Sequence, residues 1–228
     1  ALYTFPNVTD DNARYGNFRD NPFHLIGIEA ANMAKCDLAI SALLTPQRKI
    51  SQIYAGHFSK SHIEAMSILR ASMLLAVNEP MDIVITSGGG RPLDDSLTGL
   101  LEAISCYLPV LKPNGTVVVS AALRNGLGPS TFTELVRSHS NLKEAIEKLS
   151  ENETLHAGHW VAQRLHQILD NHEVILFNKE LDEQLIWSIG FTPARDLNEA
   201  VHEAMTTHGQ SCKIVAFPDG PTGIGDLG

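Results

Sequence analysis

The sequence predicts an α/β fold with a mostly parallel sheet flanked by helices, in the manner of a Rossmann-like domain. Two observations support this prediction. From residue 82 onward, short runs of β-branched and apolar residues alternate with longer stretches of helical periodicity. Two glycine-bearing turns, at 88–90 and 126–128, each stand between such a strand and the helix after it. We expect this domain to span residues 77–228 and a smaller α/β segment to span residues 1–76.

Composition and charge argue against several classes of protein. The 228 residues are 43% hydrophobic and 19% charged, as in ordinary globular chains. A formal charge of −9 argues against a nucleic-acid or anionic-membrane partner, because such partners need a basic surface. No apolar run approaches the roughly 18–20 residues of a membrane span. The three cysteines (Cys36, Cys106 and Cys212) lack a CxxC spacing, so we expect reduced thiols, no zinc site and a cytoplasmic protein.

The first part of the chain predicts two helices around a β-hairpin. Residues 1–21 are polar and rich in turn signals, and Asn21-Pro22 introduces the first helix. A polar turn between two short apolar runs indicates the hairpin. Ser61 with Glu64 three residues on forms a capping box for the second helix, which ends before Pro80. The expected elements are a helix over 23–34, strands over 37–44 and 50–54, and a helix over 59–77.

The second part predicts strands and helices in alternation, which is typical of βαβ units. Glycines near the C-terminus, after Asp219, indicate a loose end. The first expected strand begins at Asp82, and the later strands cover 116–120, 174–177 and 213–217. The expected helices cover 95–107, 130–138, 142–149, 157–170, 181–189 and 196–208.

The turn of Ser87, Gly88, Gly89, Gly90 and Arg91 is the first candidate site. It follows a buried strand and precedes a helix, where backbone N–H groups and the helix dipole favour an anion or small molecule. A tight turn without a ligand explains the same residues equally well. Neither GxGxxG nor GxxxxGK[ST] is present, which disfavours a dinucleotide or P-loop site and makes a nicotinamide-dependent oxidoreductase a weak third reading.

Other residues give weaker signals when taken alone. His156 and His159 have the i, i+3 spacing of a helical metal pair, but no third ligand follows at a recognisable spacing, so no metal site is predicted. Trp160 opens an amphipathic helix, and its spacing favours core packing. Glu102 and Glu134 lie inside helices that follow the glycine-bearing turns, where solvated side chains are expected. These patterns predict a small-molecule site at the strand ends and no specific chemistry.

The run from Asp82 to Asp94 resembles the strand–glycine–Pro-Leu-Asp signature of the nickel-pincer lactate racemase family. Other fragments resemble the same family in the same order, so the resemblance spans nearly the whole chain. These fragments are Ala13-Arg14 with Gly16, Asn21-Pro22, the hairpin end Ile53-Tyr54-Ala55-Gly56, Gly126-Leu127-Gly128, Trp160, and Pro218-Asp219-Gly220.

The resemblance implies a racemase or epimerase that acts at the carbon bearing a 2-hydroxyl group. Such an enzyme uses a nickel-pincer nucleotide attached to a lysine and transfers a hydride transiently to that cofactor. Two histidines serve as acid and base, and the ligand lies between an N-terminal and a C-terminal domain. The resemblance places Ser87 to Arg91 and Trp160 in the ligand cleft. It aligns Glu102 with a lysine that the family uses against substrate, which reverses the charge at that position.

Several family residues have no counterpart in this chain. The pincer lysine aligns with Leu2, no histidine lies between Pro6 and Gly16, and the acid/base histidines lie upstream of the match. Residues 1–76 then correspond to the end of the N-terminal catalytic domain. We expect an isomerase when a missing N-terminal half is present as partner, and no activity from this chain alone. A divergent branch with another substrate, and a non-catalytic module that binds a small anion at the glycine turn, remain as alternatives.

Overall fold

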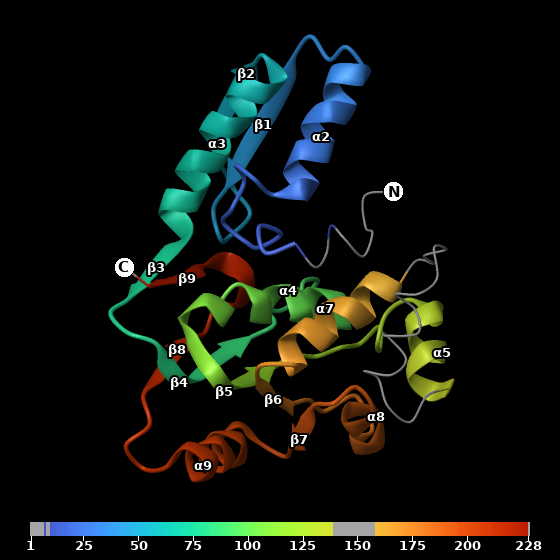
Figure 1. Ribbon diagram of the computed structural model, residues 1–228, viewed down its shortest axis with the longest axis vertical. Coiled ribbons are helices and arrows are strands. Elements are labelled where there is room, and N and C mark those ends of the chain that lie inside the picture. Colours follow the sequence, from blue (N-terminus) through green and yellow to red (C-terminus); the bar gives the residue numbers. More distant parts are fainter. Residues whose placement is uncertain (1–6, 8–9, 139–157, 228) are drawn as a thin grey trace.

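The computed structural model describes residues 7, 10–138 and 158–227. Figure 1 shows an upper part above a layer of helices, with a β-sheet below that layer and further helices at the bottom. The upper part has helix α2 (Pro22–Met33), the antiparallel hairpin of β1 (Ala39–Leu44) and β2 (Ile50–Gly56), and helix α3 (Phe58–Met73). Helix, hairpin and helix occur in the predicted order.

The lower part is built on a five-stranded sheet with the order β7-β6-β5-β4-β8. Every neighbouring pair in this sheet is parallel. The prediction of an α/β fold with a mostly parallel sheet is therefore confirmed. The strands are β4 (Met81–Ser87), β5 (Leu111–Ser120), β6 (Glu173–Phe177), β7 (Thr192–Ala194) and β8 (Ile214–Phe217).

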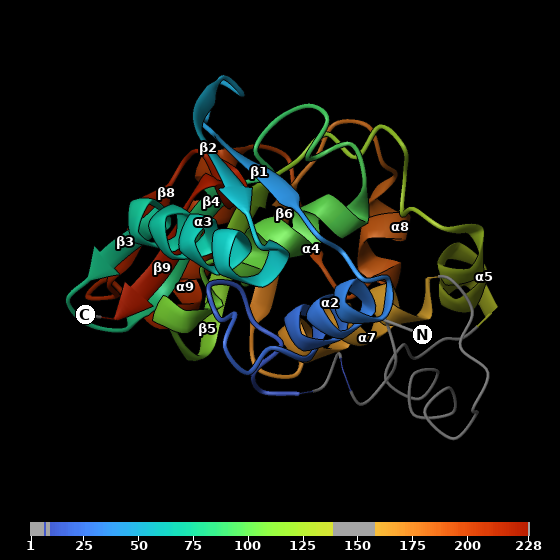
Figure 2. The ribbon, with the colours of Figure 1, turned by 90° about the horizontal axis from the view of Figure 1, so that it is seen from above.

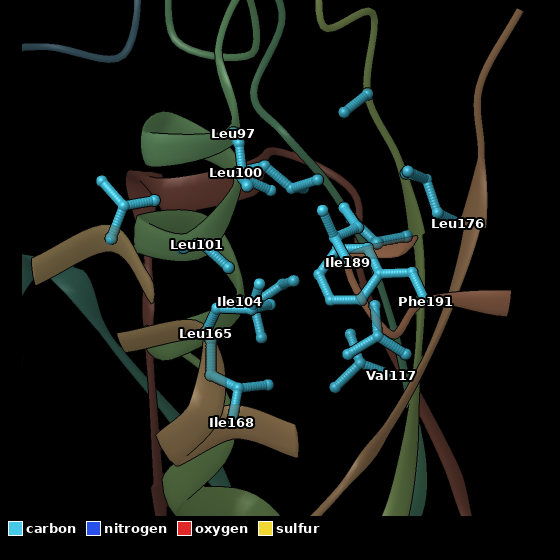
Figure 3. Packing of buried hydrophobic residues seen from close by; sticks show 14 of the residues in the cluster. Leu97, Leu100, Leu101, Ile104, Val117, Leu165, Ile168, Leu176, Ile189 and Phe191 are labelled. Carbon is cyan, nitrogen blue, oxygen red and sulfur yellow. The ribbon is translucent and has the colours of Figure 1, made fainter. Parts of the chain in front are cut away.

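Helices cover both faces of the sheet. Side chains alternate between the faces along a strand, so Val117 and Val119 join the core under α4 and α7, while Val118 joins a smaller core under α9. Figure 3 shows leucine and isoleucine side chains of α4 and α7 pointing at Val117, Leu176 and Phe191. The helices are α4 (Leu97–Ser105), α5 (Ser130–Ser138), α7 (His159–Leu169), α8 (Glu183–Ser188) and α9 (Leu197–His208).

The expected loose C-terminal end is wrong. Residues Ile224–Leu227 form strand β9, which pairs in parallel with β3 (Leu74–Val77). The helix predicted over 59–77 ends at Met73 for the same reason, because its last four residues belong to β3. Pairing between segments so far apart in the chain leaves no local signal, and glycine is a poor strand former.

Smaller differences concern ends and short elements. The expected capping box is wrong, because Ser61 lies inside α3 and its hydroxyl donates to the carbonyl oxygen of His57 at 3.1 Å. Strand β7 is short, contains Pro193 and was not predicted. The helix expected over 142–149 lies outside the described residues. Among the described residues, no helix combines the length and apolarity needed to cross a membrane. The division at residue 76 stays a prediction.

Candidate functional site

A cleft of about 340 Å³ lies between residues 13–23, α4 and α7. We call it the helix-face cleft, because α4 and α7 cover one face of the sheet (Figures 1 and 2). Two of the predicted site residues, Glu102 and Trp160, both line it. The lining residues are Ala13, Arg14, Tyr15, Gly16, Asn17, Asn21, Phe23, Met66, Thr98, Leu101, Glu102, Trp160 and Arg164.

Helix α4 turns Thr98 and Glu102 toward this cleft. Its N-cap is Ser96, whose hydroxyl oxygen accepts the backbone N–H of Gly99 at 3.5 Å. Leu97, Leu100 and Ile104 of α4 are fully buried against the sheet. Positions 98 and 102 are one turn apart and therefore share a side of the helix that is available to a ligand.

Helix α7 supplies the facing pair, Trp160 and Arg164. Val161, Leu165 and Ile168 of this helix are fully buried, so its apolar side packs on the sheet. Trp160 and Arg164 are again one turn apart on the same side. Trp160 is partly buried and packs against the main core, so its ring serves both as core edge and as cleft wall.

The third wall, residues 13–23, is held to both parts of the structure. Gly16 has φ +78°, and its carbonyl oxygen accepts a hydrogen bond from Arg70 Nε on α3 at 2.8 Å. The side-chain amide of Asn21 donates to the carbonyl oxygen of Asn17 at 3.1 Å. From the other side, Arg164 donates to the carbonyl oxygen of Ala13 at 3.4 Å. Segment and helices thus enclose the cleft together.

The cleft carries two positive charges and one negative charge. Arg14 and Arg164 line it together with Glu102, in a chain whose formal charge is −9. Burial raises the pKa of the Glu102 carboxyl, and the positive charge of Arg164 opposes that rise. Glu102 is nevertheless exposed to solvent. A site with this balance suits an anionic ligand that also carries a hydrogen-bond donor.

The glycine turn lies elsewhere. Ser87 and Gly90 line a second cavity of about 480 Å³ at the carboxyl ends of β4, β5 and β6, together with Asp94 and Lys179. We call it the strand-end cavity. Arg91 is exposed and lines neither cavity, and its Nε lies 3.2 Å from Asp95 Oδ2.

Packing accounts for two of the three glycines. A Cβ added to Gly88 would lie 2.5 Å from the Cβ of Asp94, and one added to Gly89 would lie 2.6 Å from the Cδ of Pro221. The hydroxyl of Ser87 donates to the carbonyl oxygen of Pro218 at 2.7 Å. This hydrogen bond holds the glycine turn against the segment that contains Pro218 and Pro221. Gly90 has open space around it.

The predicted site residues are therefore divided between two places, and their role in binding stays a prediction. Sequence reasoning missed Thr98, Arg164 and the wall of residues 13–23. The spacing held a usable signal, since Thr98 lies four residues before Glu102 and Arg164 four residues after Trp160.

Among the described residues, no group of three or more His, Cys, Asp and Glu side chains is placed to hold a metal ion. His156 lies outside the described residues.

Comparison with known proteins identifies a family for this chain. The model of the lactate racemase C-terminal domain matches residues 76–224. The chain is 31% identical to the lactate racemase of Thermoanaerobacterium thermosaccharolyticum over 212 residues, which are 91% of this chain and 49% of that protein. It is 28% identical to the lactate racemase of Lactiplantibacillus plantarum over 216 residues, 93% of this chain and 50% of that protein. The chain thus spans about half the length of these relatives.

Solved structures agree. The lactate racemase apoprotein from Thermoanaerobacterium thermosaccharolyticum superposes with a TM-score of 0.91 at 27% identity, covering 97% of this chain and 53% of that chain. A Thermotoga maritima protein superposes with a TM-score of 0.64 at 13% identity over 92% of this chain and 54% of that chain, which shows the fold alone. The order of motifs, the matched model and the superposition lead to one conclusion: this chain belongs to the lactate racemase family.

Proposed function

We propose that this chain forms the substrate-side half of a racemase or epimerase that acts on a 2-hydroxy acid. The helix-face cleft is the observation that supports this most directly. It brings Trp160 and position 102, which the family resemblance assigns to the substrate, into one cavity of about 340 Å³. That volume lies within the range of small-molecule sites, about 300–1,000 Å³.

Two side chains have clear roles in the proposed site. Arg164, with a planar guanidinium that suits bidentate pairing, binds and orients the carboxylate of the acid. Trp160 forms an apolar wall beside the carbon skeleton and excludes water from one side of it. Both residues stand on a helix that packs against the sheet, so the positions of their backbone atoms are fixed.

The nickel-pincer nucleotide that the resemblance implies does not fit the residues of this chain. The described residues contain no metal-binding group of acidic, histidine and cysteine side chains. Position 2, aligned with the lysine that carries the cofactor, is a leucine and lies outside the described residues. We infer that a complementing N-terminal half holds the cofactor and supplies the hydride chemistry.

An exposed apolar surface on the upper part supports such a partner half. Helix α2 has no buried residue, although its sequence is largely apolar. Many exposed apolar side chains on one part of a protein often mark an interaction surface. The relatives are about twice as long as the matched region, which leaves a domain's length of chain to cover it. The exposed side chains in this part are Leu25, Met33, Leu38, Ile40, Leu44, Ile50, Ile53, Ile63, Ile68 and Leu75.

The test compares the two tryptophans in the whole gene product that contains this chain. Trp160→Ala is expected to lower kcat/KM for racemisation of a 2-hydroxy acid by about tenfold or more, because it removes a wall of the site. Trp187→Ala is the matched control, since Trp187 is 57% exposed and lies on α8. Trp160→Phe keeps an aromatic ring against the core, and thermal unfolding checks that each variant is folded. Unchanged activity of Trp160→Ala would contradict the assignment of Trp160 to the substrate site.

The alternative, a module that binds a small anion without turnover, draws on the strand-end cavity. Lys179 and Arg124 line that cavity, and strand ends are a usual ligand position in parallel sheets. Titration of the gene product with lactate, combined with an assay for the opposite enantiomer, separates the two functions. Binding without interconversion favours the module.

A further inference from the structure

The charges of the helix-face cleft are arranged differently from what the family resemblance implies. The resemblance places a lysine at position 102, and this chain has Glu102 there. A cation is still present, but it comes from the neighbouring helix: Arg164 lines the same cleft from α7. Helices α4 and α7 pack side by side (Figure 1), so a positive charge lines the same cleft as Glu102 from the neighbouring helix.

Arg164 is available to a ligand. Its guanidinium makes two long hydrogen bonds, both at 3.4 Å, to the side-chain oxygen of Gln167 and the carbonyl oxygen of Ala13. It forms no ion pair with any carboxylate in the described part of the chain. An arginine fork with such weak partners retains most of its capacity to bind a carboxylate.

Glu102 is close to Arg164 but not paired with it. The two charges interact over a distance, yet no nitrogen–oxygen contact of 4.0 Å or less joins them. A ligand group can therefore stand between them. A carboxylate placed against Glu102 instead would be repelled by the like charge.

We infer that Arg164 and Glu102 together select a polyhydroxy 2-hydroxy acid: Arg164 holds the carboxylate, and Glu102 accepts a hydrogen bond from a hydroxyl further along the carbon chain. This inference rests on the proposed function, because it assigns a substrate class to the same cleft. Thr98, one turn before Glu102 on α4, adds a second hydroxyl-binding group on that side. Lactate lacks a hydroxyl beyond its second carbon and leaves Glu102 without a partner.

The test measures binding of gluconate and lactate to the whole gene product by calorimetry. Gluconate is expected to bind about tenfold or more tightly than lactate, since a hydrogen bond to a charged group is worth that much. Arg164→Gln is expected to weaken both acids by about tenfold or more, because both use the carboxylate contact. Arg195→Gln is the matched control: it removes the same charge from an exposed residue before α9, on the opposite face of the sheet, and leaves both affinities unchanged.

Two variants at position 102 decide the role of Glu102. Glu102→Lys restores the family charge and is expected to raise lactate affinity while abolishing the preference for gluconate. Glu102→Gln keeps the shape and an acceptor oxygen but removes the charge, so an intermediate preference is expected. Equal binding of the two acids by the unmodified protein, or the same preference in Glu102→Lys, overturns this inference and leaves the proposed function standing. Failure of both acids to bind overturns both.

Discussion

Gly220 gives the sharpest test of how the C-terminal segment shapes the strand ends. It has φ +59°, in the left-handed region, and a Cβ at this position would lie 2.5 Å from Gly89 Cα and 2.8 Å from the carbonyl oxygen of Ser87. These neighbours are backbone atoms, which cannot rotate away as a side chain can. Gly220→Ala should therefore destabilise the protein strongly.

The magnitude follows from two separable costs. The left-handed conformation costs alanine about 1–2 kcal/mol relative to glycine. Overpacking against the backbone adds about 1–3 kcal/mol or more. Gly126→Ala isolates the first cost, because Gly126 has a similar φ of +65° and nothing within 4 Å of an added Cβ. We expect the two variants to differ by at least about 1–3 kcal/mol in the free energy of unfolding.

Urea unfolding followed by circular dichroism measures both variants against the unmodified chain. Unchanged m-values confirm that each change acts on the folded state. Gly89→Ala is a useful third variant, since its added Cβ would meet the ring of Pro221 from the other side of the same contact. If Gly220→Ala loses no more stability than Gly126→Ala, the turn and the C-terminal segment do not pack as described.

Two further predictions use perturbed pKa values. Burial lowers the pKa of His172 below its usual 6.5, so the unfolded chain binds more protons and the free energy of unfolding falls as the pH drops through 6.5. Urea titrations on both sides of that pH should show a smaller fall in His172→Gln, whereas the exposed control His202→Gln should behave like the unmodified chain; identical curves for all three contradict the assignment. Burial, with the charge of Glu102, raises the pKa of the Cys106 thiol to about 12. Mass spectrometry after iodoacetamide treatment should therefore find Cys106 unmodified in the folded protein and modified after unfolding, and labelling in the folded state would refute its burial.

The sheet was predictable because its strands carry a strong local pattern. The β-branched runs at 116–120 and 174–177 are buried on both faces, as a parallel sheet requires. The helix predicted over 130–138 has those bounds in the structure, where a proline precedes the first turn. Strands β3 and β9 escaped prediction because each is stabilised by the other across the length of the domain. Such pairing depends on tertiary contacts and not on local propensity.

The candidate site was predictable only in part. The family resemblance assigned Glu102, Trp160 and the glycine turn to one ligand cleft, whereas residue patterns alone linked none of them. The structure brings Glu102 and Trp160 together from α4 and α7 and leaves the glycine turn outside that cleft. Arg164 was overlooked because an arginine on a helix is usually a solvated side chain. Arg164 lines a cleft only because residues 13–23 lie against α7, and a local sequence pattern does not reveal that tertiary contact.

The segment after β8 limits where a ligand can bind at the strand ends. In open parallel sheets, ligands usually bind at the point where the strand order reverses, here between β4 and β8. In this chain the segment after β8 occupies that point. Ser87 donates to the carbonyl oxygen of Pro218, and Tyr107 donates to the carbonyl oxygen of Gly220. The helix-face cleft lies away from that closed crevice, and its charged side chains are Arg14, Glu102 and Arg164. Its specificity therefore depends on α4, α7 and residues 13–23 rather than on the glycine turn.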